Sequence, residues 1–365
     1  MRDQLQAYQI ELTVKGPVFI GSGQRIEKKE YIFLTPDTLG VIDAGKLFQL
    51  AKRRGLEQKL EKFMVTDTKR DLKQWAIEHG VPLGEMQDCM KYVMNAGDME
   101  EEENHRLIME CCVDPYGKPY VPGSSVKGML RTILLCSDIL RDRARFRGIG
   151  QSMERELEEE GVKRSVLQKT TRAIETEVFH TLDRSPNRGN AVNDRMAGIR
   201  VSDSEPLDWK DVILCQKWER HVDGTVKTLP ILCECIKPGT KIRCSLTIDK
   251  GMCELSESDI MERISLYYEM YYSTFQSKFA GEQKSSENTV FLGGGSGFAS
   301  KTLIYSLFGG RHGIDITAKI FKKTGVPGRH KHFKDMELGA SPHILKCTRY
   351  QGKEYHMGEC EASII

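Results

Sequence analysis

Tyr120-Val121-Pro122-Gly123-Ser124-Ser125-Val126-Lys127-Gly128-Met129-Leu130-Arg131 is the stretch that decides the fold. The Pro-Gly pair ends any preceding strand, and two serines follow, which are residues that commonly cap helix N-termini. Apolar side chains then recur at 126, 129, 130, 133 and 134, the spacing of one helix face. We therefore predict an amphipathic helix that starts near residue 123, with hydroxyl caps from Ser124 and Ser125.

The start of this predicted helix is also a candidate phosphate contact. Lys127 and Arg131 are four residues apart and therefore share one helix face, beside the hydroxyls of Ser124 and Ser125. A helix N-terminus, hydroxyls and cations are the groups that bind phosphate. A capped helix with a solvated basic edge accounts for these residues equally well.

Upstream of this stretch, the pattern predicts strands and then helices. Residues 8–14 and 31–34 alternate as strands around the turn-like segment 21–23, which suggests a β-hairpin. Residues 44–110 change to helical spacing and are expected to form a helical insert. The acidic residues that close it, Asp98 and 100–103, are expected to be a solvated surface.

Downstream, strand-like runs occur at 199–202, 212–215, 231–236 and 241–248. Ser256 begins a capping-box pattern before a long amphipathic helix, whose tyrosines at 267, 268 and 271 are spaced for core packing rather than for base stacking. The order strand, helix, strand appears in both halves. We therefore predict an α+β fold with two related domains, 1–195 and 196–365.

A glycine loop, Gly293-Gly294-Gly295-Ser296-Gly297, follows a predicted strand at 289–292 and precedes a helical run at 300–308. Such a loop can bind an anion through backbone N–H groups. A nucleotide-binding P-loop fits at Gly295, Lys301 and Thr302, but Ser300 stands where that pattern requires its second glycine. A tight structural turn, or a loop that holds a nucleic-acid backbone with Ser296, Ser300 and Lys301 as donors, remains open.

Two further segments are candidate nucleic-acid contacts. Residues 316–334 carry Lys and Arg without any carboxylate, and Arg329 and Lys331 lie in this basic loop. The loop 183–196, with Arg184, Arg188 and Arg195, is a weaker candidate for an exposed element that wedges against RNA. Both segments are also explained as ordinary surface loops.

Composition sets wider limits. The chain has 365 residues, 54 Lys and Arg and 52 Asp and Glu, so its formal net charge is only +2 and a partner bound by bulk charge alone is excluded. It shows neither an apolar run of roughly 20 residues nor a signal-peptide pattern. The 11 cysteines form no disulfide framework. We expect a soluble, cytoplasmic protein with reduced thiols and no membrane contact.

The residues suggest no catalytic centre, metal or cofactor. Hydrolase and metalloprotease motifs are absent from the sequence, and Asp183, Asp194 and Asp203 have no partner at a suggestive spacing, Asp203 being a turn residue by its context. The close pair His330 and His332 is flanked by Lys and Arg, which repel a cation. We therefore expect no metal site.

Together these pieces resemble the RAMP superfamily of CRISPR proteins. The resemblance is carried by residues 16–23, 120–131 and 291–298 and by the Ile-x-Pro-Gly-Thr pattern at 236–240. It implies two RRM-like (ferredoxin-like) domains, with the helical insert in the first. The early segment 21–33 and the length are most similar to the subunit at the end of type III-A (Csm) effector complexes.

That resemblance implies a non-catalytic subunit of antiviral defence. It would bind the 3′ part of the CRISPR RNA (crRNA), cap the filament and serve crRNA maturation, with a neighbouring RAMP backbone subunit, the small helical subunit and target RNA as partners. The residues expected along the RNA are Gly21, Ser22, Gly23, Ser124, Ser125, Lys127, Arg131, Arg195, Gly293, Gly294, Gly295, Ser296, Gly297, Lys301, Arg329 and Lys331.

Two other functions stay open. One is a metal-independent RNA endonuclease of the RAMP type, with His180, His312 or His330 as general base. The other is a nucleotide hydrolase that depends on Lys301.

Overall fold

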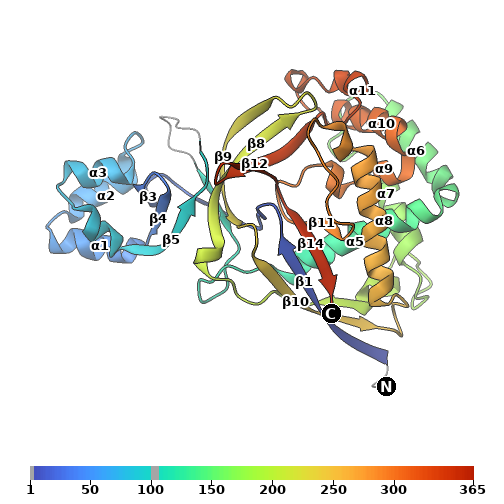
Figure 1. The fold of residues 1–365 in the computed structure, drawn as a ribbon, viewed down its shortest axis with the longest axis horizontal. Coiled ribbons are helices and arrows are strands. Elements are labelled where there is room, and N and C mark those ends of the chain that lie inside the picture. Colours follow the sequence, from blue (N-terminus) through green and yellow to red (C-terminus); the bar gives the residue numbers. More distant parts are fainter. Residues whose placement is uncertain (1–3, 100–106) are drawn as a thin grey trace.

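The computed structural model describes residues 4–99 and 107–365 and has a mixed α and β architecture. Two curled sheets form the centre, most helices pack beside them, and a small group of helices projects away from this body (Figure 1). The expected acidic surface at 100–103 lies outside the described residues. Asp98 is described, and its carboxylate accepts a hydrogen bond from the Gly352 N–H at 2.5 Å.

The first sheet has the strand order β11-β14-β1-β10-β7 and is antiparallel throughout. Its strands are β1 (Leu5–Val14), β7 (Ile199–Val201), β10 (Lys241–Asp249), β11 (Thr289–Phe291) and β14 (Glu359–Ile364). The helices α5 (Gly123–Arg141) and α8 (Glu257–Thr274) lie between them in the chain. The order β1-α5-β7-β10-α8-β14 is the β-α-β-β-α-β order of a ferredoxin-like unit.

The second sheet has the order β2-β6-β9-β8-β5-β4-β3, with a further pair of strands attached at β8. Its strands are β2 (Gly21–Ile26), β3 (Tyr31–Thr35), β4 (Thr38–Ile42), β5 (Met90–Ala96), β6 (Ile108–Cys111), β8 (Val212–His221), β9 (Val226–Ile236), β12 (Ile344–Tyr350) and β13 (Lys353–His356). The predicted strands at 199–202, 212–215, 231–236 and 241–248 are confirmed as β7 to β10.

The predicted hairpin of residues 8–14 with 31–34 is wrong. β1 pairs with β10 and β14, whereas β3 pairs with β4. Gly21–Gly23 is not a turn but the start of β2, which pairs with β6. Its glycines and serine are exposed and give no alternation, so the sequence offers no strand signal there.

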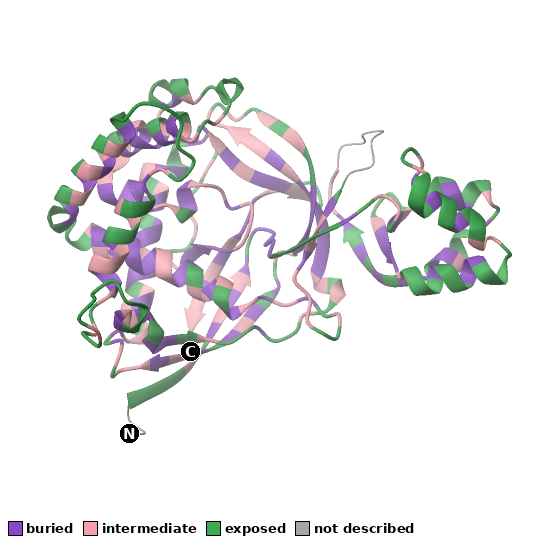
Figure 2. Ribbon diagram, turned by 180° about the vertical axis from the view of Figure 1, so that it is seen from behind, coloured by how far each residue is buried: buried purple, intermediate pink, exposed green. Residues whose placement is uncertain are grey.

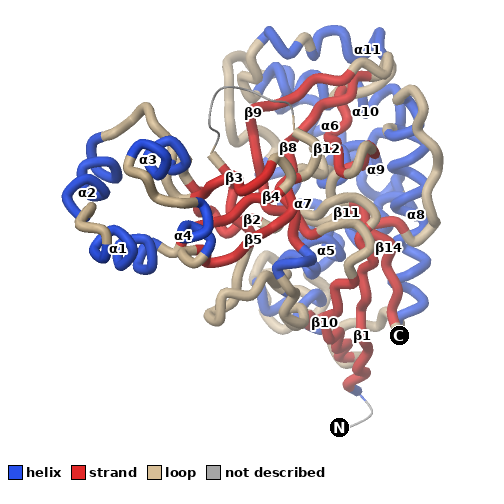
Figure 3. Tube along the Cα trace, turned by 60° about the vertical axis from the view of Figure 1, so that its left-hand side comes forward, coloured by secondary structure: helices blue, strands red, loops and turns tan. Residues whose placement is uncertain are grey.

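Of the segment 44–110 that we predicted as a helical insert, residues 44–87 form helices, and β5 and β6 occupy much of the described remainder. The insert consists of α1 (Ala44–Arg53), α2 (Glu57–Thr66), α3 (Leu72–Glu78) and α4 (Leu83–Gln87), and it projects beside β3, β4 and β5 (Figures 1 and 3). Its helices enclose a separate core around Leu47, Phe63, Trp75 and Met86. The chain then returns to the second sheet as β5 and β6.

The remaining helices pack against α5, α8 and one another. They are α6 (Arg147–Glu158), α7 (Gln168–Phe179), α9 (Ile304–Phe308), α10 (Gly310–Lys323) and α11 (Asp335–Leu338). Figure 2 shows the buried residues concentrated between these helices and the strands. The predicted apolar stripe of α5 is buried, and Tyr267, Tyr268 and Tyr271 of α8 are buried in the same core, which confirms packing over base stacking.

The two sheets do not divide at residue 195, because each of them contains strands from both sides of that residue. The central strand of the first sheet, β1, comes from the beginning of the chain, and its neighbours β10 and β14 come from the second half. The second sheet likewise joins β2 to β6 with β8, β9 and β12. Within the described residues, no helix is both long and apolar enough to cross a membrane. The 11 cysteines are free thiols, as expected.

Candidate functional site

The three sequence segments singled out above meet at one cavity of about 360 Å³. Gly21 contributes the first residue of β2, Ser125 and Gly128 come from the first turns of α5, and Gly293 and Lys301 come from the glycine loop after β11. The three segments are each more than a hundred positions from the next one in the chain. We call this cavity the central groove.

The glycine loop is held against the start of β2. The Gly294 N–H donates to the Phe19 carbonyl at 2.7 Å. Gly293 has φ +81°, and a Cβ atom there would lie 2.3 Å from the same carbonyl oxygen. Glycine is therefore required at 293 for a close approach within the chain, as in the structural-turn interpretation.

The loop serines are structural as well. Ser296 and Ser300 are buried, and their hydroxyls donate to the carbonyls of Gly293 at 3.2 Å and of Ser296 at 2.9 Å. These hydrogen bonds hold the loop in shape, and a contact of either serine with a ligand stays a prediction. Of the predicted donors in this loop, Lys301 alone is exposed.

Lys301 at the groove, Lys217 beside the glycine loop and Lys127 of α5 form no ion pair with a carboxylate of the described residues. Lys301 reaches back over the loop and donates to the Gly293 carbonyl at 2.6 Å. Its pKa is lowered by desolvation and by the charge of Lys217. Desolvation also lowers the pKa of Lys127. An anion beside these ammonium groups would relieve both effects, so the groove favours negative charge.

Sequence reasoning missed Lys217. It belongs to β8, and its ammonium lies 5.4 Å from the ring centre of Phe19. The only sequence signal is Lys217 after the apolar run 212–215, next to the polar Gln216. Its placement beside the glycine loop depends on strand pairing across the second sheet, which no local pattern indicates.

The predicted hydroxyl caps of α5 are wrong. Pro122 occupies the N-cap position, and neither Ser124 nor Ser125 caps the helix. Instead, Asp203 accepts a hydrogen bond from the Gly123 N–H at 2.8 Å. The cap comes from a residue 80 positions away, so the serines remain available: Ser124 is exposed, and Ser125 faces the central groove.

The two predicted arginines next to α5 are engaged with other side chains. Arg131 pairs with Asp194 at 2.8 Å, and Arg195 pairs with Asp138 at 2.5 Å. Both guanidinium groups lie over the Phe179 ring, at 4.2 and 5.8 Å from its centre. Their charges are neutralised by carboxylates, unlike those of the three lysines described above.

The loop 183–196 is folded back on the body. Buried Asn193 accepts hydrogen bonds from the backbone N–H groups of Arg184 and Ser185 at 2.7 and 2.9 Å. Arg188 pairs with Glu177 at 2.9 Å. These contacts, with the Arg195 pair, tie the predicted wedge to the protein.

The basic segment is shorter than predicted, because residues 316–323 belong to α10. Lys319 pairs with Asp315, and Lys323 is buried and donates to the Glu159 carbonyl. Lys322, at the end of α10, and Arg329, Lys331 and Lys334 beyond it are exposed and form no ion pair with a described carboxylate. We call residues 328–334 the basic segment from here on; a cavity of about 210 Å³ separates it from Gly297.

The geometry gives little support to catalysis at the residues considered. The Lys301 ammonium binds a carbonyl of its own glycine loop. The loop is followed by only a short 3₁₀ turn, Ala299–Lys301, and the short helix α9, which differs from the P-loop arrangement in which a helix follows the loop directly. His180 bonds to the Arg188 carbonyl, His312 bonds to Glu154, and His330 is exposed. No described contact joins these three histidines.

Comparison with known proteins gives a consistent set of relatives. The family model of the RAMP superfamily matches residues 11–294. A protein named CRISPR system Cms protein Csm5 from Mycobacterium tuberculosis (strain H37Rv) is 30% identical and is aligned over 100% of this chain and 99% of its own length. The Streptococcus thermophilus protein of the same name is 25% identical, over 83% and 82%.

Two solved structures share the fold. The crystal structure of T. onnurineus Csm5 has a TM-score of 0.63 and 18% identity, over 96% of this chain and 99% of that one. A chain of a cryo-EM structure of a Csm–crRNA–target RNA ternary complex in a type III-A CRISPR–Cas system has a TM-score of 0.64 and 18% identity, over 98% and 100%.

Proposed function

The chain belongs to the RAMP superfamily and, within it, to the Csm5 proteins, and on that premise we propose that it is an RNA-binding subunit of a type III-A CRISPR effector complex. We propose that it has no catalytic centre, binds the 3′ portion of the crRNA at the end of the filament, and is needed for crRNA maturation in antiviral defence. Its partners would be a RAMP backbone subunit, the small helical subunit and target RNA.

The observation that carries this proposal is the convergence of three motif segments on the central groove. The groove offers the Ser125 hydroxyl and the ammonium of Lys301, with Lys217 beside the glycine loop. Lys127 lies between the groove residues Ser125 and Gly128 in the chain. Lysines and hydroxyls bind phosphates without reading bases. The groove therefore suits a sugar-phosphate backbone of any sequence.

Because Arg131 and Arg195 are paired with carboxylates, we propose fewer residues as RNA contacts than the sequence suggested. Arg131 and Arg195 serve the packing of α5 and the 183–196 loop, so we assign the contacts to Lys127, Lys217 and Lys301. The basic segment would contact RNA beyond the groove, past Gly297.

We also propose that the fold derives from two RRM-like units. The first is the unit β1-α5-β7-β10-α8-β14, and the second is built around the paired strands β8, β9 and β12 with the helical insert attached. In this view the units are interleaved along the chain rather than divided at residue 195.

The test is reconstitution of the effector complex with and without this chain. Small RNAs that co-purify are sequenced and their 3′ ends mapped. We expect mature crRNA with an intact repeat-derived tag in the full assembly, and unprocessed 3′ ends when the chain is omitted. Identical 3′ ends in both preparations would contradict the proposal.

The same preparation separates the two enzymatic alternatives. Purified chain that cleaves repeat RNA, with loss of cleavage on changing His180, His312 or His330, would establish an endonuclease. Nucleotide hydrolysis abolished by Lys301→Ala would establish a hydrolase. We expect neither activity.

A further inference from the structure

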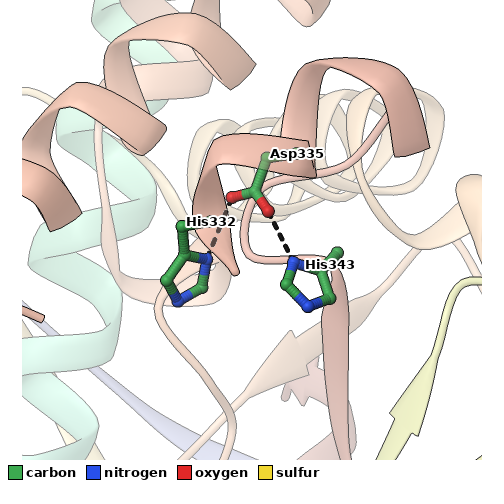
Figure 4. Close-up of side chains that lie close together, drawn as sticks. All are labelled: His332, Asp335 and His343. Atoms are coloured by element: carbon green, nitrogen blue, oxygen red, sulfur yellow. Dashed lines mark hydrogen bonds and ion pairs between the residues drawn. The ribbon is translucent and has the colours of Figure 1, made fainter. Parts of the chain in front are cut away.

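A buried carboxylate holds two histidines beside the basic segment. Asp335 is fully buried at the start of α11, and its two oxygens contact the Nδ1 atoms of His332 at 3.0 Å and of His343 at 2.5 Å (Figure 4). The Ser341 hydroxyl also donates to it, at 2.5 Å. The three ligand-type residues come from the turn before α11, from α11 itself, and from the residue before β12.

The charge of this cluster needs a counterion. A buried carboxylate is costly unless a positive charge accompanies it. No Lys or Arg in the described part of the chain pairs with Asp335, whose ion-pair partners are the two imidazoles. A metal ion between the imidazoles and Asp335 would supply such a charge.

The rings around Asp335 lie close together. The His332 and His343 rings are 5.3 Å apart, and His221 stacks on His343 at 5.7 Å. One divalent ion at this point would supply positive charge next to the carboxylate and hold both imidazoles to it.

The spacing also fits a metal. The ligand atoms of His332, Asp335 and His343 all lie within 4.8 Å of one another. Tetrahedral ligands with bonds of about 2.1 Å lie roughly 3.4 Å apart, so the contacts of 3.0 and 2.5 Å with Asp335 would lengthen as an ion enters. Two imidazole nitrogens and a carboxylate are typical ligands of zinc and of other divalent first-row metals.

We propose that His332, Asp335 and His343 bind one divalent first-row transition metal ion, with zinc as the natural occupant. The ion takes the place of the Nδ1 protons between the imidazoles and Asp335, and water completes its coordination. It ties the basic segment to the start of β12. His330, which shares the sequence pair with His332, is exposed and is not a ligand. The neighbouring Arg329, Lys331 and Lys334 are exposed, so water screens their charges.

The test uses the full chain without a histidine tag, freed of metal by a chelator and then titrated with Zn²⁺ and with Co²⁺. We expect one equivalent of each to bind, and Co²⁺ to give the visible absorption of a tetrahedral nitrogen and oxygen site. His343→Ala and His332→Ala should each weaken binding by at least about tenfold. The matched control His330→Ala should leave it unchanged.

A second readout guards against variants that fail to fold. Trypsin cuts after exposed Arg329, Lys331 and Lys334, so bound Zn²⁺ should slow cleavage of the basic segment in the unaltered chain. Absence of stoichiometric binding by the unaltered chain would overturn the proposal. So would binding that survives both histidine changes, or that is lost equally in His330→Ala.

Discussion

Lys301→Ala provides the sharpest test of the central groove, with Arg131→Ala as its counterpart. Both changes remove one positive charge from a predicted RNA contact. Lys301 has no carboxylate partner in the described structure, whereas Arg131 is paired with Asp194 at 2.8 Å and lies over Phe179. Lys301→Ala should therefore affect mainly RNA binding, and Arg131→Ala mainly the stability of the protein.

The magnitudes follow from these contacts. Each phosphate contact on single-stranded nucleic acid contributes roughly 0.7 to the slope of log affinity against log salt. Lys301→Ala should flatten that slope by about 0.7 and cost only about 0.5 kcal/mol of stability, from the exposed hydrogen bond to the Gly293 carbonyl. Arg131→Ala should leave the slope nearly unchanged and reduce the free energy of unfolding by about 1 kcal/mol, the sum of a partly exposed ion pair and a cation–π contact.

The assay is fluorescence polarisation of a labelled, guide-length RNA over a salt series, with urea unfolding of each variant. Lys59→Ala, an exposed lysine of the helical insert, controls for the change in net charge. A flatter slope for Arg131→Ala together with an unchanged one for Lys301→Ala would refute the assignment of the groove lysines. A slope lowered equally in Lys59→Ala would reduce the effect to bulk charge.

Three further predictions test the structure that builds the site. Gly293→Ala should destabilise the protein by about 3 kcal/mol, because the new Cβ atom clashes with Phe19 and the alanine must also adopt a positive φ. The control Gly239→Ala, at φ +89° in open space, should cost about 1 kcal/mol. Equal losses of stability in urea unfolding would contradict the close approach at Gly293. Asp203→Ala should lower the free energy of unfolding by about 1 kcal/mol, because the cap of α5 is lost, and Ser124→Ala should lower it by less than about 0.5 kcal/mol. The reverse order would indicate that the serine hydroxyls cap the helix after all. Burial lowers the pKa of His356 to about 3, so between pH 6.5 and 3 the unfolded chain binds the proton more readily than the folded one. The free energy of unfolding therefore falls by up to about 1.4 kcal/mol for each pH unit of acidification in this range. His356→Phe should reduce this loss of stability at low pH, and an unchanged pH profile of unfolding would exclude His356 as its source.

The sequence predicted what depends on local patterns. Helical spacing located α1 to α3, α5 and α8, and the capping box at Ser256 is present with Asp259 as its partner. It also located the three segments of the central groove. It missed contacts that cross the chain: the Asp203 cap, the position of Lys217, and the pairing of Asp335 with His343.

The wrong predictions have the same cause. Serines after Pro-Gly indicate a cap only when no distant carboxylate takes that role, and exposed glycines resemble a turn when their strand partner lies elsewhere in the chain. Arginine in a polar loop suggests a ligand contact until tertiary packing supplies a carboxylate, as it does for Arg131 and Arg195. A single sequence does not reveal these partners.

The position of β1 has a consequence for how the protein is made. This strand is the first of the chain, yet it lies between β10 and β14, the last strand. During synthesis its edge stays unpaired until almost the whole polypeptide has left the ribosome, and such an edge is prone to wrong association. The helical insert, with its own core, can fold early, but the first sheet closes only after β14 has been made. Chains that lack β14 should therefore aggregate rather than join larger assemblies.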